Sequence, residues 1–338
     1  MQRDHEYHAL TLARVVDETP DARSFVLEVP PALVERFAYR AGQFCTFRTT
    51  IDGEAVARCY SMSSSPEAGE PLTVTVKRVA GGRMSNWMNE QLAAGDAIDV
   101  QVPAGLFVLR AAERPIVAFA GGSGITPIIS IVKTALLTTT REIALVYANR
   151  DAQSVIFAEA LDALRVASHG RLRLHSHLDS ESGFLGPAAC AELVGDRIDS
   201  DFYVCGPGPF MAVVEAGLAE RGVDPDRIFI ERFDDLDESP AAPLASETES
   251  LVIRIRGRKH EITYMPGESI LHAARRAGLK PPSACQAGAC GTCMALVVEG
   301  RVTMRVNNAL EPDEVEQGYV LTCQATPMSR EVVVDYEA

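Results

Sequence analysis

Four cysteines late in the chain have a spacing that suits one kind of inorganic chemistry. Cys285, Cys290 and Cys293 form a Cys-x4-Cys-x2-Cys run, and Cys323 follows thirty residues after the third of them. Four thiolates with this spacing can hold two irons bridged by two sulfides, the plant-type arrangement of a 2Fe–2S cluster. Such a cluster moves one electron at a time, so the remaining residues must explain where its electrons come from and where they go.

Two other uses of four cysteines compete with this prediction. Structural zinc sites usually pair their ligands in two short Cys-x2–4-Cys segments, whereas here three cysteines cluster and one stands apart. Disulfides need an oxidising compartment, and the polar N-terminus lacks the apolar core of a signal peptide. The small residues Gly288, Ala289 and Gly291 also favour the cluster, because a loop of small residues can wrap closely around it.

Length, composition and charge narrow the class of protein. A chain of 338 residues suggests two or three domains. Its 47% apolar and 23% charged residues are typical of a soluble globular protein, and its net charge of −14 disfavours a nucleic-acid partner. The longest apolar stretch, residues 116–137, is broken by glycines and a proline, so no membrane span is predicted. Together with the cysteine usage, these features favour a reducing, cytoplasmic compartment.

Residues 1–110 contain the short alternating runs of half-buried strands. Leu72, Val74 and Val76 alternate with polar neighbours, and turn residues separate similar runs. Several strands at this spacing suggest a small barrel or a sandwich. The other runs lie near residues 8–16, 23–29, 43–49 and 97–102, and one helix is predicted near residues 85–93.

Two motifs in this region could bind an anion and a ring. Arg58, Tyr60 and Ser61 lie close together on one predicted strand, where they could meet a phosphate, a ring and a hydroxyl, although surface strand residues explain them about as well. Gly82 and Ser85 lie at the start of the predicted helix, whose free N–H groups attract anions. An ordinary N-cap by Ser85 would explain that second motif too.

Residues 111–233 alternate apolar runs with helical patterns, which is typical of an open parallel sheet. Strands are predicted near residues 115–120, 143–147, 171–177, 202–204 and 227–230. The loop from Gly122 to Pro127 follows the first strand and reads Gly-x-Gly-x-x-Pro rather than the usual dinucleotide fingerprint. Its physics is the same, because glycines let the backbone approach a pyrophosphate and the helix N-terminus stabilises the negative charge.

The last third of the chain contains a spacer and then the cysteines. Residues 234–250 are acidic, rich in Pro, Ala and Ser, and without periodicity, so we expect a mobile linker. Alternation returns at Leu251, Ile253 and Ile255, and a helix closed by Gly278 precedes the cysteine loop.

Taken in order, these regions resemble the ferredoxin–NAD(P)+ reductase superfamily with a plant-type ferredoxin domain at the C-terminus. The resemblance covers essentially the whole chain. Residues 58–66, 146–159 and 205–211 are most similar to reductase components of multicomponent oxygenases, such as the 3-ketosteroid 9α-hydroxylase and phenylacetyl-CoA oxygenase reductases.

This resemblance implies a multidomain fold. The expected parts are an antiparallel β-barrel FAD domain at residues 1–110, an α/β parallel-sheet nucleotide domain at 111–233, the linker at 234–250, and an α+β β-grasp ferredoxin domain at 251–338.

The resemblance also implies how FAD is bound. Arg58 would neutralise the flavin phosphate, Tyr60 would pack on the isoalloxazine ring, and Ser61 would hydrogen-bond to the ring system. Three further segments match a phosphate-binding turn, a strand beside the flavin and the nicotinamide dinucleotide loop. Their residues are Gly82, Met84 and Ser85; Val76 and Lys77; and Gly121, Gly122, Gly124, Thr126 and Pro127.

Two residues are expected to take part in hydride transfer. Cys205, Gly206 and Pro207 match a Cys-Gly-Pro motif whose cysteine lies near the nicotinamide carbon that donates hydride. A buried thiol at a strand end is the alternative for Cys205. Glu231 and Phe233 resemble an aromatic-ended segment that covers the flavin face, so Cys205 and Glu231 are the expected catalytic residues.

The nucleotide is expected to be NADH, with NADPH possible. A 2′-phosphate would need a basic pocket after the second strand of the nucleotide domain, where the sequence has Asn149, Arg150 and Asp151. One arginine beside an acid is thin support for such a pocket.

Electron counting then gives the expected function. NAD(P)H gives two electrons at once, as hydride, the cluster accepts one, and a flavin can do both. The chain is expected to be the reductase that passes electrons from NADH through FAD and the 2Fe–2S cluster to a terminal oxygenase with Rieske non-haem iron. A di-iron oxygenase or a separate carrier is the alternative acceptor. A redox sensor that uses the flavin and the cluster as reporters is the alternative from another class. No nucleic-acid or membrane partner is expected.

Overall fold

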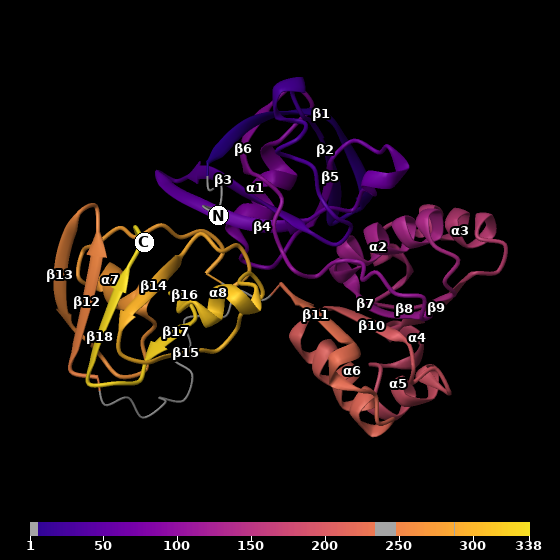
Figure 1. Cartoon of the computed structure of the whole chain (residues 1–338). Helices are drawn as coiled ribbons and strands as arrows, with labels where there is room; N and C mark the ends of the chain where they lie inside the picture. The colour runs from indigo at the N-terminus through magenta and orange to yellow at the C-terminus, as the bar shows by residue number, and fades with distance from the viewer. Residues whose placement is uncertain (1–5, 234–247, 287) are drawn as a thin grey trace. The chain divides into compact units, whose positions relative to one another are not determined.

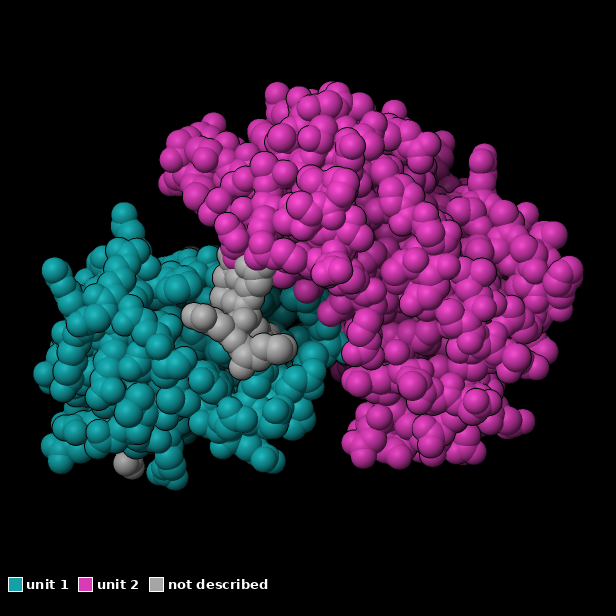
Figure 2. Space-filling view, turned by 45° about the horizontal axis from the view of Figure 1, so that its top comes forward, with its two compact units in different colours: residues 1–5, 104–106, 234–338 teal, residues 6–103, 107–233 magenta. Residues whose placement is uncertain are grey.

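The structure, a computed structural model, describes residues 6–233, 248–286 and 288–338 (Figure 1). It separates into two compact units, and Figure 2 distinguishes them by colour. The larger unit consists of Glu6–Pro103 and Phe107–Phe233, so it contains both the first sheet and the parallel sheet. The linker predicted at residues 234–250 lies almost wholly outside the described residues. No helix in the described ranges is long and apolar enough to cross a membrane.

The first sheet is a closed barrel, which decides between the two architectures that the strand pattern left open. Its six strands are antiparallel, in the order β4-β3-β6-β1-β2-β5. Met62, directly after β4, forms an antiparallel bridge with Val74 in β5, and Ser63 N–H donates to Thr73 O at 2.9 Å. These contacts join the two edge strands. The strands are β1 (Tyr7–Thr19), β2 (Ala22–Glu28), β3 (Phe44–Ile51), β4 (Glu54–Ser61), β5 (Thr73–Lys77) and β6 (Ala97–Gln101).

Helix α1 (Arg83–Gln91) packs on the barrel core through Met84 and Met88, which lie one turn apart and are both buried. The helix begins and ends two residues before the predicted range of 85–93. Ser85 is not its N-cap, because Gly82 occupies that position. The Ser85 hydroxyl instead accepts a hydrogen bond from Val79 N–H at 3.2 Å, which holds the turn before the helix.

The second sheet has five parallel strands in the order β11-β10-β7-β8-β9. The order along the chain reverses between β7 and β10, which places a topological switch point at the carboxyl ends of these two strands. The strands are β7 (Ile116–Gly121), β8 (Ile143–Asn149), β9 (Leu172–Leu178), β10 (Asp201–Gly206) and β11 (Ile228–Arg232). The helices are α2 (Ile125–Thr138), α3 (Ala158–Ala167), α4 (Asp179–Ser182), α5 (Pro187–Val194) and α6 (Gly208–Glu220).

Helix α3 is preceded by a separate turn and does not follow β8 directly. Asp151 and Ser154 form a reciprocal capping box around the short 3-10 turn Ala152–Ser154. Phe157 then adopts a left-handed conformation, with φ of 62°, immediately before α3. The capping signal therefore belongs to a separate turn and not to the helix.

The smaller unit contains a mixed sheet in the order β13-β12-β18-β14-β16. Its central pair, β12 and β18, is parallel, and helix α7 (Ile270–Arg276) packs on the sheet through Ile270, Ala273 and Ala274. A mixed sheet wrapped around one helix is the expected β-grasp arrangement. The strands are β12 (Ser250–Ile255), β13 (Arg258–Thr263), β14 (Met294–Glu299), β16 (Tyr319–Leu321) and β18 (Glu331–Asp335), and β15 (Val302–Met304) pairs with β17 (Ala325–Pro327). A short helix, α8 (Pro312–Glu316), precedes β16.

Candidate functional site

Two loops meet main chain to main chain at the switch point of the parallel sheet. A Cβ built on Gly124 would lie 2.1 Å from Cys205 O, far inside van der Waals contact. A Cβ on Gly206 would lie 3.0 Å from Gly121 Cα and 2.7 Å from the Phe210 ring. Glycine is therefore required in both loops. Their close approach lies at the switch point between the carboxyl ends of β7 and β10, where open sheets of this kind bind ligands in a crevice.

The N-terminus of α2 is available to an anion. Gly122 turns the chain with a φ of 51°, and the hydroxyl of Thr126 donates to Ser123 O at 3.1 Å. No side chain in the described ranges caps α2, and Ile125 N–H, at the first residue of the helix, donates to Gly122 O and Ser123 O. The N–H groups that lack an intrahelical partner are therefore those of the preceding 3-10 turn, Gly122–Gly124. A pyrophosphate fits this arrangement because it would satisfy these donors. The structure thus brings together the predicted loop residues Gly121, Gly122, Gly124, Thr126 and Pro127.

Cys205 and Glu231 are neighbours on adjacent strands. They are paired in the register of β10 and β11, and both are buried, with Glu231 only 4% exposed. Burial raises the pKa of the Glu231 carboxyl to about 8, so at neutral pH it mainly carries its proton and can donate a hydrogen bond. Phe233 follows β11 and is 38% exposed. Cys205 is indeed a buried strand-end thiol, but it lies beside a buried acid at the crevice.

The last residue of β8, Asn149, is buried, whereas Arg150 directly after the strand is exposed. Asn149 is 4% exposed, and its Oδ1 atom has no hydrogen-bond partner among the described residues. A buried acceptor without a partner is costly unless a ligand satisfies it. The Arg150 side chain is 71% exposed, and its Nε atom lies 2.9 Å from Asp151 Oδ2. The Tyr147 hydroxyl donates to Gly122 O at 3.1 Å, which ties β8 to the glycine loop.

The expected flavin residues of β4 lie in three different environments. Ser61 is 3% exposed, and its Oγ atom has no partner within the described part of the chain. Tyr60 packs against Phe47 with ring centroids 5.8 Å apart, and Arg58 donates to Ala57 O at 2.8 Å. The unsatisfied Ser61 hydroxyl fits a cofactor ring with hydrogen-bonding groups.

The turn before α1 suits a second phosphate. Gly82 precedes the helix without a capping side chain, and a Cβ added to it would lie 2.5 Å from Ser85 Oγ. The helix N–H groups are therefore left open on this side. Val76 and Met84 are wholly buried in the barrel core, so their side chains do not line this turn.

Lys77 extends from the barrel towards the nucleotide loop. Its Nζ atom lies 3.8 Å from the position of a Cβ on Gly122, and also 3.8 Å from Asp21 Oδ2. The sequence did not indicate the contact of Asp21 with Lys77, because only the pairing of β2 with β5 brings these residues together.

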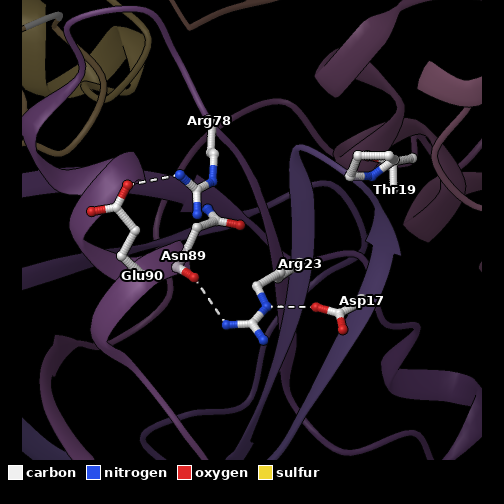
Figure 3. Close-up of a pocket in the computed structure, with 7 residues that line it drawn as sticks. Asp17, Thr19, Arg23, Arg78, Asn89 and Glu90 are labelled. Carbon is white, nitrogen blue, oxygen red and sulfur yellow. Dashed lines mark hydrogen bonds and ion pairs between the residues drawn. The ribbon is translucent and has the colours of Figure 1, made fainter.

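A separate polar hollow lies on the barrel and is lined by no residue of the loops at 121–127 and 205–207 (Figure 3). Its volume is about 440 Å³. Arg23 pairs with Asp17 at 2.6 Å and Arg78 pairs with Glu90 at 2.7 Å, so the charges of the hollow are balanced by its own residues.

The four cysteines of the smaller unit are buried and form two pairs. Cys290 N–H donates to Cys285 Sγ at 3.3 Å, and a hydrogen bond with Cys323, together with burial, raises the pKa of the Cys293 thiol. Two irons that each take two protein thiolates require such a division.

The loop around these cysteines also carries polar atoms without partners. Thr292 Oγ1 and Gln324 Oε1 are buried and unpaired among the described residues. Gln324 Nε2 donates to Gln286 O at 2.7 Å, and a Cβ on Gly288 would lie 2.8 Å from Gln324 Cγ. The small residue at position 288 is therefore needed for the loop to close. Ala287 lies outside the described residues.

Three protein-family models match the chain in the predicted order. They describe an oxidoreductase FAD-binding domain over residues 9–109, an oxidoreductase NAD-binding domain over 119–216, and a 2Fe–2S iron–sulfur cluster binding domain over 253–328. These matches confirm the expected fold class and the cofactors FAD, NAD and 2Fe–2S, and they decide against zinc.

Whole-length relatives extend the match. The ferredoxin reductase component of the 3-ketosteroid-9-alpha-monooxygenase of Mycolicibacterium smegmatis is 40% identical and is aligned over 97% of this chain and 96% of that protein. One component of the 1,2-phenylacetyl-CoA epoxidase of Escherichia coli is 37% identical over 98% of both chains. Among solved structures, a phthalate dioxygenase reductase has a TM-score of 0.63 at 24% identity and covers 97% of this chain and 98% of its own, which shows the same fold.

Proposed function

We propose a function for this chain, which belongs to the family of FAD- and 2Fe–2S-containing reductase components of multicomponent oxygenases. The proposal is that NADH binds in the crevice between β7 and β10. When bound, FAD accepts a hydride and releases its electrons singly, and the 2Fe–2S cluster carries them one at a time. The observation that carries the proposed site is the contact of the glycine loop with Cys205, which sets an anion-binding helix N-terminus beside a buried thiol and a buried acid.

In the nucleotide crevice, the N–H groups of the 3-10 turn Gly122–Gly124 would hold the pyrophosphate, and Asn149 Oδ1 would accept a hydrogen bond from a ribose hydroxyl. Glu231 holds a proton on its carboxyl below a pH of about 8 and donates it to a hydrogen bond at this end of the crevice.

At the barrel, Ser61 Oγ would hydrogen-bond to the flavin ring, because it has no hydrogen-bond partner among the described residues. Arg58 neutralises a flavin phosphate, and the uncapped start of α1 at Gly82 binds the second. Two separate phosphate sites favour FAD over a flavin with one phosphate. Tyr60 and Phe233 pack on the ring faces.

In the smaller unit, the cysteine pairs divide the cluster. Cys285 and Cys290 would hold one iron, and Cys293 and Cys323 would hold the other. Thr292 Oγ1 is placed to donate to a cluster sulfur, because it is buried and unpaired among the described residues.

NADH is preferred over NADPH. The only basic side chain directly after β8 is Arg150, which is largely exposed and already paired with Asp151. The residues that follow, Ala152 and Gln153, offer no further positive charge, so a 2′-phosphate gains little there.

The electron acceptor is a terminal oxygenase, and a Rieske non-haem iron enzyme is the proposed type. The identity with the phenylacetyl-CoA epoxidase component makes an epoxidase-type oxygenase the second candidate. The eight cysteines form no disulfide among the described residues, and the proposed location is a reducing, cytoplasmic compartment.

One experiment tests the function. The purified, cofactor-loaded protein is expected to contain one FAD, two irons and two acid-labile sulfides per chain, and to reduce cytochrome c continuously with NADH. Finding FMN, or zinc in place of iron, contradicts the cofactor assignment. A single round of flavin reduction without turnover supports the sensor alternative instead.

A further inference from the structure

Three serines directly after the flavin strand β4 are tied into the protein rather than left for a cofactor. Ser63, Ser64 and Ser65 are all buried, none more than 3% exposed. Ser63 Oγ pairs with Thr75 Oγ1 at 2.9 Å inside the barrel. Ser65 Oγ pairs with Thr134 Oγ1 at 2.8 Å, and this partner belongs to helix α2 beside the parallel sheet. The serine run therefore connects the barrel to the helix that begins at the glycine loop.

Helix α2 presents a polar stripe to this run. Ser130, Lys133 and Thr134 lie three and four residues apart, so they share one face of the helix. Ser130 Oγ donates to Ser64 O at 2.6 Å, and Lys133 Nζ donates to Ser63 O at 3.2 Å. Two main-chain carbonyls directly after the flavin strand are thus held by side chains of the nucleotide-binding half.

One carboxylate ties the helix to the serine run. Glu70 Oε2 lies 2.9 Å from Lys133 Nζ and accepts a hydrogen bond from Ser65 N–H at 2.8 Å. The Lys133 side chain is only 19% exposed, so solvent screens this ion pair less than a surface pair. Glu67 adds a second contact, because its Oε2 accepts from the Thr134 hydroxyl at 3.2 Å.

We propose that Ser130, Lys133 and Glu70 form a latch of positioning residues that sets how the nicotinamide meets the flavin. The proposal rests on the proposed function. Helix α2 starts in the loop that holds the dinucleotide, and the latch lies one to two turns further along the helix. The helix therefore links the nicotinamide site rigidly to the flavin site. At its other end, the serine run begins two residues after Ser61 of the flavin motif.

The physical reason is that hydride transfer needs reacting atoms held about 3–3.5 Å apart, and a misplacement of about 1 Å can cost about 100-fold in rate. Apolar packing holds α2 on one side, where Ile131 lies beside Gly42 and Phe107. On the side of Thr134 and Glu67 there is instead a cavity of about 590 Å³. The side chains on the face of α2 that meets the serine run are polar, so hydrogen bonds and the ion pair, rather than apolar packing, hold this face in place.

The test uses the full-length, cofactor-loaded protein and rapid mixing with NADH, following flavin absorbance. For Lys133→Met we expect the limiting rate of flavin reduction to fall about tenfold. The NADH dissociation constant and FAD content should stay close to those of the wild type, because the residue touches neither ligand. Lys133→Arg, which keeps the charge and the reach, should restore the rate to within about threefold.

The matched control is Arg165→Met, which breaks an exposed ion pair with Asp162 on α3, and it should leave the rate unchanged. Combining Lys133→Met with Glu70→Gln should lower the limiting rate no further than the larger single change does, because both changes remove the same ion pair.

A limiting rate within twofold of the wild type in Lys133→Met overturns the latch, and so does an equal loss in the control. Failure of the wild type itself to reduce its flavin with NADH would contradict the proposed function instead, so the two failures are distinguishable.

Discussion

The crevice between β7 and β10 and the cysteine loop after α7 are built from different kinds of atoms. The crevice depends on main-chain groups, with Gly124 against Cys205 O and an uncapped helix start, and its parts come from distant segments. The cysteine loop depends on four side-chain thiolates that lie between residues 285 and 323. The crevice should therefore be damaged by atoms that are added, and the cluster site by atoms that are removed.

The largest expected effect is at the cysteine loop. Cys293→Ser removes one thiolate from the pair with Cys323, so we expect cytochrome c reduction to fall by about 100-fold or more. Flavin reduction by NADH should persist, because its residues lie in the other unit. Iron content and stopped-flow flavin traces measure the two activities separately. Loss of flavin reduction in a folded, flavin-loaded variant would contradict this separation.

At the crevice, the comparison is sharpened by adding one carbon. Gly124→Ala places a Cβ 2.1 Å from Cys205 O, so one of the two loops must move. We expect the rate of flavin reduction by NADH to fall about 100-fold, with the iron content unchanged. Gly186→Ala is the matched control, because no atom lies within 4 Å of its added Cβ and its φ is −105°. Equal behaviour of the two variants would show that close approach of the loops is not needed.

The buried acid beside Cys205 gives an intermediate effect with a defined pH dependence. Burial raises the pKa of Glu231 from 4.5 to about 8, so the folded state binds its proton more tightly than the unfolded state. Its contribution to stability is full below pH 4.5 and is lost as the pH rises to about 8. Relative to Glu231→Gln, the wild type should lose a few kcal/mol of unfolding free energy across this window.

Denaturant unfolding of both proteins between pH 4.5 and 9 measures this difference. Parallel curves for the wild type and Glu231→Gln would mean that the carboxyl is already ionised in the folded protein.

The smallest expected effect is at the exposed rim of the crevice. Arg150→Ala removes a side chain that is 71% exposed and paired with Asp151, so kcat/KM for NADH should change by less than about threefold. NADH should remain the better substrate in both proteins. A preference of the wild type for NADPH of about tenfold would overturn the assignment of the nucleotide.

Local patterns were enough to predict much of the fold. The period-2 runs predicted the strands of the barrel, and the alternation of Leu251, Ile253 and Ile255 predicted β12 in the β-grasp unit. Helix α5 (Pro187–Val194) was missed, because its short apolar segment has weak helical periodicity and is positioned by packing on α6. There a Cβ on Gly217 would lie 2.6 Å from Cys190 Cβ. Tertiary packing therefore decided an element that local pattern did not mark.

The candidate site was predicted residue by residue but not in its geometry. The glycine loop, the Cys-Gly-Pro run and Glu231 were each marked in the sequence, yet nothing local places Gly124 against Cys205. Lys77 was expected beside the flavin, and only the structure shows that it also reaches Gly122. The contact of Asp21 with Lys77 has no local signal in the sequence.

By itself, the sequence determined which chemical groups this protein brings to electron transfer, because ligand spacing and glycine content are properties of neighbouring residues. The four cysteines and the glycine loops identify an iron–sulfur protein that binds nucleotides, without knowledge of the tertiary structure. The tertiary structure alone decided which of these groups meet. Strand order sets the apposition of β7 and β10, the bridge from Met62 to Val74 closes the barrel, and Lys133 reaches Glu70 across sixty-three residues. These are long-range contacts, and they form because distant apolar faces are buried together, which no short stretch of sequence records.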